Sequence, residues 1–220
     1  MRKKRIIILV SIISFVILAS SVTVYLLYRY NVITHRSYTD TDFDIETYHS
    51  KMDKDNDGIE DQSDILQNVR AYIATNPKYK SKYYASGYPN DEYGVCTDVV
   101  AFGLKDAGYD LMELVDADIR KNPESYNIKK PDKNIDFRRV RNLNVYFAHT
   151  AISLTTDLKE IKEWQGGDIV VFEAHVAVIS DKRNHKGIPF LIHNASPNQF
   201  RYEEDVLERW GKIIGHYRIS

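Results

Sequence analysis

The chain has 220 residues, which is enough for one ordinary domain and some additional sequence but not for two large domains. Its 30 Lys and Arg residues nearly balance its 31 Asp and Glu residues, which argues against a nucleic-acid binder, because such a protein needs a basic surplus. With 43% hydrophobic residues the chain can bury a core and is not a disordered tail. Its single cysteine excludes an internal disulfide and a multi-cysteine zinc site.

The chain begins with a candidate membrane anchor. Residues 6–28 carry no charge, and a helix of this length spans about 35 Å, enough to cross a bilayer core. The basic residues RKKR at 2–5 precede this segment, so the positive-inside rule places the N-terminus in the cytoplasm and all residues after 28 outside. A cleaved signal peptide with a weak cleavage site at 19–21 is the alternative. We expect residues 1–28 to form an uncleaved, single-pass anchor in a bacterial cell membrane.

Residues 29–52 are polar and predict an extracytoplasmic stalk, and residues 62–220 predict one domain. Apolar residues at helical spacing predict helices over 65–73, 96–107 and 111–121. The polar segment 122–142 follows them, and then apolar segments predict strands over 169–172, 175–180 and 189–194, the last two joined as a hairpin. Helices followed by an antiparallel sheet are typical of the α+β class.

Residues 53–64 fit the twelve-residue calcium loop of the EF-hand type. Carboxylates at fixed positions would converge on the ion, the glycine at position 6 permits the sharp turn, and position 7 would offer a backbone carbonyl. The loop resembles the calcium repeats of dockerins and thrombospondins. The alternative is a solvated acidic turn whose last aspartate caps the next helix. We expect a structural calcium ion, held by Asp53, Asp55, Asp57, Ile59, Asp61 and Asp64.

The only cysteine, Cys96, is the first residue of a predicted helix. The dipole and the unpaired backbone donors at a helix N-terminus favour a thiolate and can stabilise an oxyanion. Such a nucleophile also needs a base and a group that orients the base. Ordinary core packing is the alternative interpretation of this residue.

Two of the seven histidines, His175 and His193, interrupt predicted apolar strands. A hairpin loop at 182–186 would set them opposite each other, with Cβ atoms about 5 Å apart. We expect His175 to take the thiol proton and His193 to fix its tautomer. Asn194 is a weaker candidate for the orienting group, because it points to the opposite face of a regular strand. Two satisfied strand-end histidines are the alternative.

Three motifs, WQGGDIVVF, HVAVIS and LIHNAS, resemble a pattern of NlpC-type cysteine peptidases, a papain-like superfamily. YGVCTDVVAFGLKDAGYDL, KNIDFRRVRNL, WQGGDIV and EEDVLERW…GHYR are similar to the bacterial family catalogued as domain of unknown function 1287 (DUF1287), over roughly residues 62–220. The resemblance implies an NlpC-type fold, with N-terminal helices packed on a small antiparallel β-sheet. It also implies a cysteine nucleophile, a histidine base and a polar third residue, which fall on Cys96, His175 and His193.

The superfamily further implies amide bonds of cell-wall peptides as substrates. Residues 95–98 read Val-Cys-Thr-Asp where NlpC-type enzymes usually have Asp-Cys-Ser-Gly, so the pocket beside the thiol differs. We expect Asp98 to complement the helix dipole. A cluster at 136–139 is either a carboxylate-reading clamp, with Asp136, Arg138 and Arg139, or a set of solvated charges.

These observations favour a membrane-anchored cysteine amidase or endopeptidase that acts on peptidoglycan stem peptides and binds no nucleic acid. One alternative is a calcium-stabilised cell-surface module that binds the wall or a partner and has no catalytic activity. Another is a hydrolase in which Cys96, His175 and His193 hold a zinc ion.

Overall fold

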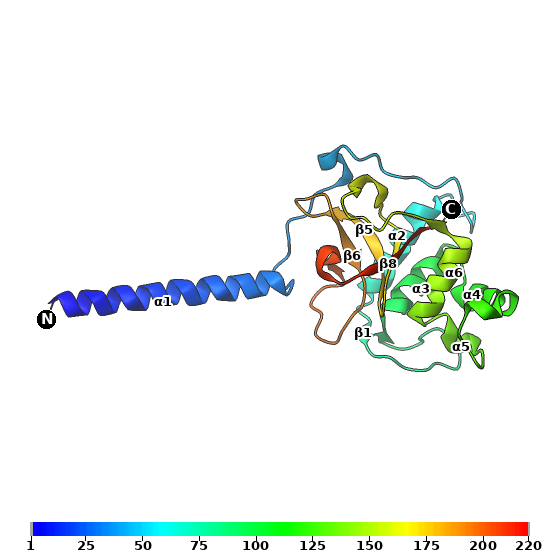
Figure 1. The fold of residues 1–220 in the computed structure, drawn as a ribbon, viewed down its shortest axis with the longest axis horizontal. Helices are drawn as coiled ribbons and strands as arrows, with labels where there is room; N and C mark the ends of the chain where they lie inside the picture. Colours follow the sequence, from blue (N-terminus) through cyan, green and yellow to red (C-terminus); the bar gives the residue numbers. More distant parts are fainter. Residues whose placement is uncertain (1, 220) are drawn as a thin grey trace. The chain divides into compact units, whose positions relative to one another are not determined.

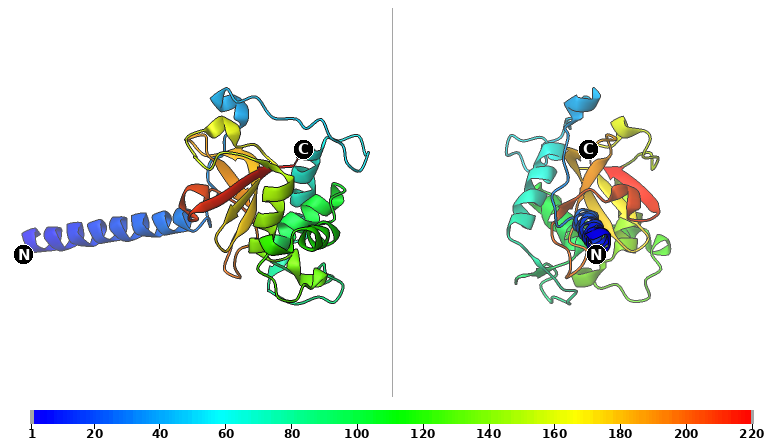
Figure 2. Two further views of the ribbon diagram at one scale, coloured as in Figure 1. Left: turned by 45° about the vertical axis from the view of Figure 1, so that its right-hand side comes forward. Right: turned by 90° about the vertical axis from the view of Figure 1, so that its left-hand side faces the viewer.

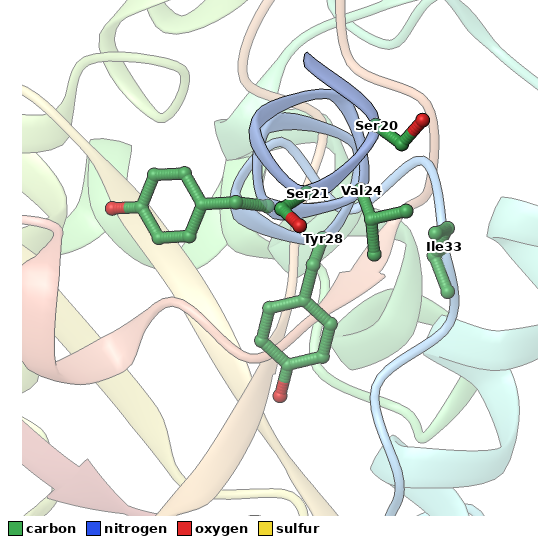
Figure 3. A pocket seen from close by; sticks show the side chains of 6 residues that line it. Ser20, Ser21, Val24, Tyr28 and Ile33 are labelled. Carbon is green, nitrogen blue, oxygen red and sulfur yellow. The ribbon is translucent and has the colours of Figure 1, made fainter. Parts of the chain in front are cut away.

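Helix α1 (Arg2–Arg29) has no buried face and belongs to a unit that ends at His35. By length and composition it is a candidate membrane span or signal sequence, which confirms the predicted apolar helix. Within this unit the chain turns back, and the ring of Tyr28 stacks on His35 with centroids 3.7 Å apart. Val24, Tyr28 and Ile33 border an apolar hollow there (Figure 3). The computed structural model describes residues 2–219.

The second unit begins at Arg36 and is built on an antiparallel sheet with strand order β3-β8-β4-β5-β6-β7 (Figure 1). The central strands consist mainly of β-branched and other apolar residues and are buried on both faces. The strands are β3 (Ile152–Ser153), β4 (Ile169–Phe172), β5 (Val176–Arg183), β6 (Pro189–Ile192), β7 (Glu203–Glu204) and β8 (Ile213–Arg218). A separate short parallel pair consists of β1 (Lys78–Tyr79) and β2 (Tyr93–Gly94).

Helices pack against one face of the sheet, and Figure 2 shows them gathered beside the strands. Their apolar stripes meet alternate strand residues such as Val171 and Val178 in one core cluster. Helices α2 and α3 approach closely at Gly103, where a Cβ would lie 2.2 Å from Val69. The helices are α2 (Asp61–Ala74), α3 (Cys96–Asp106), α4 (Leu111–Lys121), α5 (Lys133–Asp136) and α6 (Val140–Thr150).

The other face of the sheet carries a second core cluster, which includes Trp164, Ile179 and Leu191. Short 3-10 turns contribute to its cover. The four 3-10 turns in residues 2–219 are η1 (Asp40–Phe43), η2 (Pro123–Ser125), η3 (Ile161–Glu163) and η4 (Leu207–Arg209). The predicted α+β class with an antiparallel sheet is confirmed.

The predicted hairpin register is wrong by two residues. Ile192 pairs with Val178 and Leu191 with Ile179, so that His193 is not directly opposite His175. Strand β5 continues to Arg183 through an irregularity after Ile179, and this extension shifts the turn. A shift of two residues, unlike a shift of one, keeps every side chain on its predicted face.

The predicted stalk at 29–52 is also wrong from Arg36 onward. Tyr38 forms a β-bridge with Arg183, whose fully buried guanidinium is paired with Asp40. Ile45 is buried, and the backbone N–H of Tyr48 donates to Gln165 over 3.0 Å. A buried guanidinium needs a carboxylate partner, and the segment before the calcium-type loop supplies it. Residues 36–52 are therefore part of the domain.

Candidate active site

Cys96 lies at the start of α3, directly after β2, and its side chain is partly buried. Asp98 determines where the helix begins, because its carboxylate accepts the backbone N–H of Val95 over 2.8 Å. The same carboxylate receives Nε and Nη2 of Arg138 at 2.6 and 2.9 Å, and both side chains are buried. Arg138 is therefore paired within the protein and is not available to bind a ligand carboxylate, as one interpretation of the sequence had it. It fastens the segment 122–142 to the helix that carries Cys96.

The two predicted imidazoles are in contact. His175 directly precedes β5 and His193 directly follows β6, and Nε2 of His175 lies 2.8 Å from Nδ1 of His193. His193 is fully buried and His175 is 8% exposed. The ring of Trp210 packs against both, with centroids 4.5 Å from His175 and 4.6 Å from His193. The pairing expected from the sequence is thus present as a diagonal contact.

Cys96 and His175 line the same cavity, which has a volume of about 400 Å³. This volume falls in the range of roughly 300–1,000 Å³ that is typical of small-molecule sites. Tyr79 and Trp210 supply aromatic walls, and the remaining lining includes Glu173 and Lys212. His193 is not among the lining residues, so it lies behind the residue expected to act as the base.

Burial raises the pKa of the Cys96 thiol to about 11, although backbone hydrogen bonds from Val176 and Thr97 favour the thiolate. Burial also lowers the pKa of both imidazoles well below the usual value, and the nearness of His193 lowers that of His175 further. Burial therefore opposes the thiolate that the helix N-terminus is expected to favour.

Asn194 points away from the histidine pair, as predicted. Its side-chain N–H groups donate to the carbonyls of Pro77 and Gly94, at 2.8 and 3.1 Å. Gly94 precedes Cys96 by two residues, so Asn194 ties the end of the sheet to the segment that presents the thiol. Between His193 and Asn194, the geometry favours His193 as the orienting group.

Sequence reasoning missed Trp210 and Glu204. Nε2 of His193 lies 3.2 Å from a carboxylate oxygen of Glu204, which is itself buried. Glu204 lies on β7, and a strand of two residues has no periodicity that a pattern can reveal. The only available signal was its place in the motif EEDVLERW.

The calcium-type loop brings three of its expected ligands together. Ligand oxygens of Asp53, Asp55 and Asp57 lie within 4.8 Å of one another. Asp64 is buried nearby, and its pKa is raised to about 6 by burial and by the charges of Asp57, Asp55 and Asp61. The remaining aspartate, Asp61, is engaged elsewhere: Tyr109 donates to it, and the backbone N–H of Lys54 donates to it over 2.7 Å. Ile59 lies in the same loop, where its N–H donates to Asp57 over 2.8 Å.

Comparison with known proteins gives two matches. The family described as "Domain of unknown function (DUF1287)" matches residues 66–219. The chain is 37% identical over 161 residues to "Uncharacterized protein YijF" of Escherichia coli (strain K12), covering 69% of this chain and 77% of that protein. No solved structure matches. The family match includes every residue that lines the cavity, and the chain belongs to the DUF1287 family.

Proposed function

We propose that the protein is a membrane-anchored cysteine amidase or endopeptidase with an NlpC-type, papain-like fold. Its proposed substrates are amide bonds of cell-wall stem peptides outside the membrane. The observation that carries the proposal is the shared cavity, in which Cys96 at a helix N-terminus faces the same space as His175, with His193 bonded behind. The order of motifs that resemble NlpC-type peptidases supports the same class.

The proposed reaction begins with a neutral thiol. Sγ of Cys96 attacks the carbonyl carbon while His175 takes the S–H proton, and backbone N–H groups at the start of α3 face the developing oxyanion. The imidazolium then gives this proton to the leaving amine, which leaves a thioester on Cys96. Water, deprotonated by His175, hydrolyses the thioester and restores the thiol.

The proposed location follows from the charges around α1. Basic residues 2–5 form the first turn of the helix, ahead of its uncharged segment 6–28, and acidic residues follow the helix, so the N-terminus would be cytoplasmic and the cavity would face the outside. A cysteine enzyme without disulfides is compatible with that location, because the single thiol has no partner with which to form a bridge.

The test is digestion of purified bacterial cell wall by the full-length protein in detergent, with new amino groups counted over time. Cys96→Ala should abolish their release. His185→Gln, which changes an exposed histidine at the β5–β6 turn, should digest at the wild-type rate. Equal digestion by Cys96→Ala and wild type would overturn the proposal. Wall binding that survives in Cys96→Ala, without digestion by either protein, would favour the non-catalytic surface module.

The zinc alternative has less support. One zinc ion would need His175 and His193 to direct a nitrogen each at a common point, together with the sulfur. Instead, Nε2 of His175 and Nδ1 of His193 point at each other over 2.8 Å. This hydrogen bond occupies one nitrogen of each ring, and a shared metal ion would have to compete with it for those nitrogens.

We also propose that residues 53–64 bind calcium as a structural ion. The donor set is chemically suitable, because calcium prefers carboxylate and carbonyl oxygens and the three clustered aspartates concentrate negative charge. Added calcium should raise the unfolding temperature of the wild type. Asp55→Asn should weaken this response, and Asp116→Asn, which changes a carboxylate on α4, should not. An unfolding temperature that is unaffected by millimolar calcium would contradict the proposal.

A further inference from the structure

A line of hydrogen bonds continues behind the histidine pair to Glu204. Nε2 of His175 lies 2.8 Å from Nδ1 of His193, and Nε2 of His193 lies 3.2 Å from Oε2 of Glu204. All three side chains are more than nine-tenths buried. The line therefore connects a carboxylate in the interior to an imidazole that borders the cavity.

Each hydrogen bond in this line has only one direction when Glu204 is ionised. A carboxylate can only accept, so the proton on the ring of His193 must be on Nε2. The neutral ring then has its lone pair on Nδ1, which accepts the proton on Nε2 of His175. His175 is left with its lone pair on Nδ1, the nitrogen that is not used in the line.

We propose that Glu204 is a positioning residue that fixes the tautomers of His193 and His175, so that Nδ1 of His175 receives the thiol proton. This inference rests on the proposed function of Cys96. When the S–H bond breaks and the Nδ1–H bond forms, His175 becomes an imidazolium. The carboxylate of Glu204, one ring further along, then partly balances the new positive charge through side chains that are buried from solvent.

Glu203, the residue before Glu204, holds β7 against the rest of the domain. Glu203 forms ion pairs with Arg70 at 2.8 Å and with Lys182 at 2.5 Å, and it accepts the hydroxyl of Ser180. These contacts hold the strand against β5 and α2. The hydrogen bond from His193 to Glu204 is therefore not needed to keep β7 in place.

Trp210 supports the same arrangement. Its ring packs against both imidazoles, so that they cannot turn freely, and it also lines the cavity. With the ring planes restrained by packing, the remaining choice is which nitrogen of each ring carries the proton. Glu204, which can only accept a hydrogen bond when it is ionised, determines which nitrogen carries the proton.

The test is Glu204→Gln in the full-length protein. Glutamine has nearly the same shape but is no longer an obligatory acceptor. When its NH2 group donates to Nε2 of His193, every hydrogen bond in the line is reversed and a proton lies on Nδ1 of His175. Long-range ¹H–¹⁵N spectra of histidine-labelled protein report the tautomers directly. We expect Nε2–H forms for His175 and His193 in the wild type, and a loss of these forms in Glu204→Gln.

Release of amino groups from cell wall should fall about 10- to 100-fold in Glu204→Gln, as when carboxylate partners of metal-binding histidines are removed. Glu208→Gln is the matched control, because Glu208 is a nearby carboxylate that pairs with Lys186 and contacts neither imidazole. It should keep wild-type tautomers and wild-type release.

Three results would overturn the inference. They are an Nδ1–H form of His193 in the wild type, unchanged tautomers in Glu204→Gln, and full wall digestion by that variant. These results are distinguishable from a failure of the proposed function. In that case the wild type and Cys96→Ala would release amino groups equally or not at all, and the tautomers would still show whether Glu204 controls the histidine pair.

Discussion

Two buried histidines of the domain, His216 and His175, differ in what their ring nitrogens contact. Both nitrogens of His216 are engaged: Nδ1 lies 2.7 Å from the carbonyl of Thr155 and Nε2 lies 3.0 Å from Asp168. Its ring stacks on Trp164 with centroids 3.8 Å apart. Such an imidazole holds the sheet to its surroundings and has no nitrogen left for chemistry.

His175 also packs against a tryptophan, but only its Nε2 has a hydrogen-bond partner among residues 2–219. It lines a cavity together with the only thiol of the chain. The comparison shows that burial and an aromatic neighbour do not by themselves distinguish a structural histidine from a reactive one. What distinguishes His175 is a ring nitrogen without a partner among the described residues in a side chain that shares a cavity with Cys96, and the proposed role rests on this difference.

Exchanging each histidine for glutamine gives the largest expected contrast. His175→Gln should reduce amino-group release from cell wall, counted per folded molecule, about 10²- to 10⁴-fold, because the proposed base and acid is lost. His216→Gln should keep release per folded molecule but lower the free energy of unfolding by about 1–3 kcal/mol, because a partner of buried Asp168 is lost. Urea unfolding and wall digestion of both variants measure the contrast. Lost digestion in His216→Gln together with retained digestion in His175→Gln would contradict it.

The buried ion pair between Arg138 and Asp98 at the start of α3 should, like His216, contribute to folding stability. Arg138→Met leaves the fully buried Asp98 without its partner and should cost about 3–5 kcal/mol of folding stability. The matched change is Arg120→Met, which removes an exposed i,i+4 pair with Asp116 and should cost about 0.3–0.5 kcal/mol. Chemical denaturation of the two variants measures the difference. Equal losses would mean that the buried pair does not fix the helix that carries Cys96.

A smaller effect is the dependence of stability on pH. Because burial lowers the pKa of the histidine pair, the unfolded chain binds more protons than the folded chain below pH 6.5. Stability should therefore be complete above pH 6.5 and fall as the pH is lowered, by up to about 1.4 kcal/mol per pH unit for one buried imidazole. Urea midpoints at pH 7 and pH 5 should differ less in His193→Gln than in the wild type. An identical pH dependence in His193→Gln and the wild type would contradict a lowered pKa of the histidine pair.

Local sequence patterns predicted the elements that carry the site, and they failed where distant parts of the chain meet. The helix at Cys96 and the strands that adjoin the two histidines follow from periodicity, and the alternation of a strand placed both imidazoles on one face. The register was wrong because β5 extends to Arg183, which is paired with Asp40 in a segment far away in sequence. The same contact explains why residues 36–52 were mistaken for a stalk.

The electrostatics of the site were less predictable than its geometry. A helix N-terminus next to Cys96 is visible in the sequence, but the extent of burial that raises the pKa of the thiol is not. Glu204 could not be found because it follows an irregular loop and belongs to a strand too short for a pattern. Both features depend on tertiary packing, which fixes burial and the register of short strands.

The most direct measurement uses the single cysteine of the chain. The wild-type protein is alkylated with iodoacetamide at alkaline pH, because partial burial raises the pKa of the thiol, and the modified fraction is read from the intact mass. Release of amino groups from purified cell wall is then measured on the same samples. The account predicts that release falls in proportion to the modified fraction and stops when modification is complete. Undiminished release by fully alkylated, folded protein would contradict it.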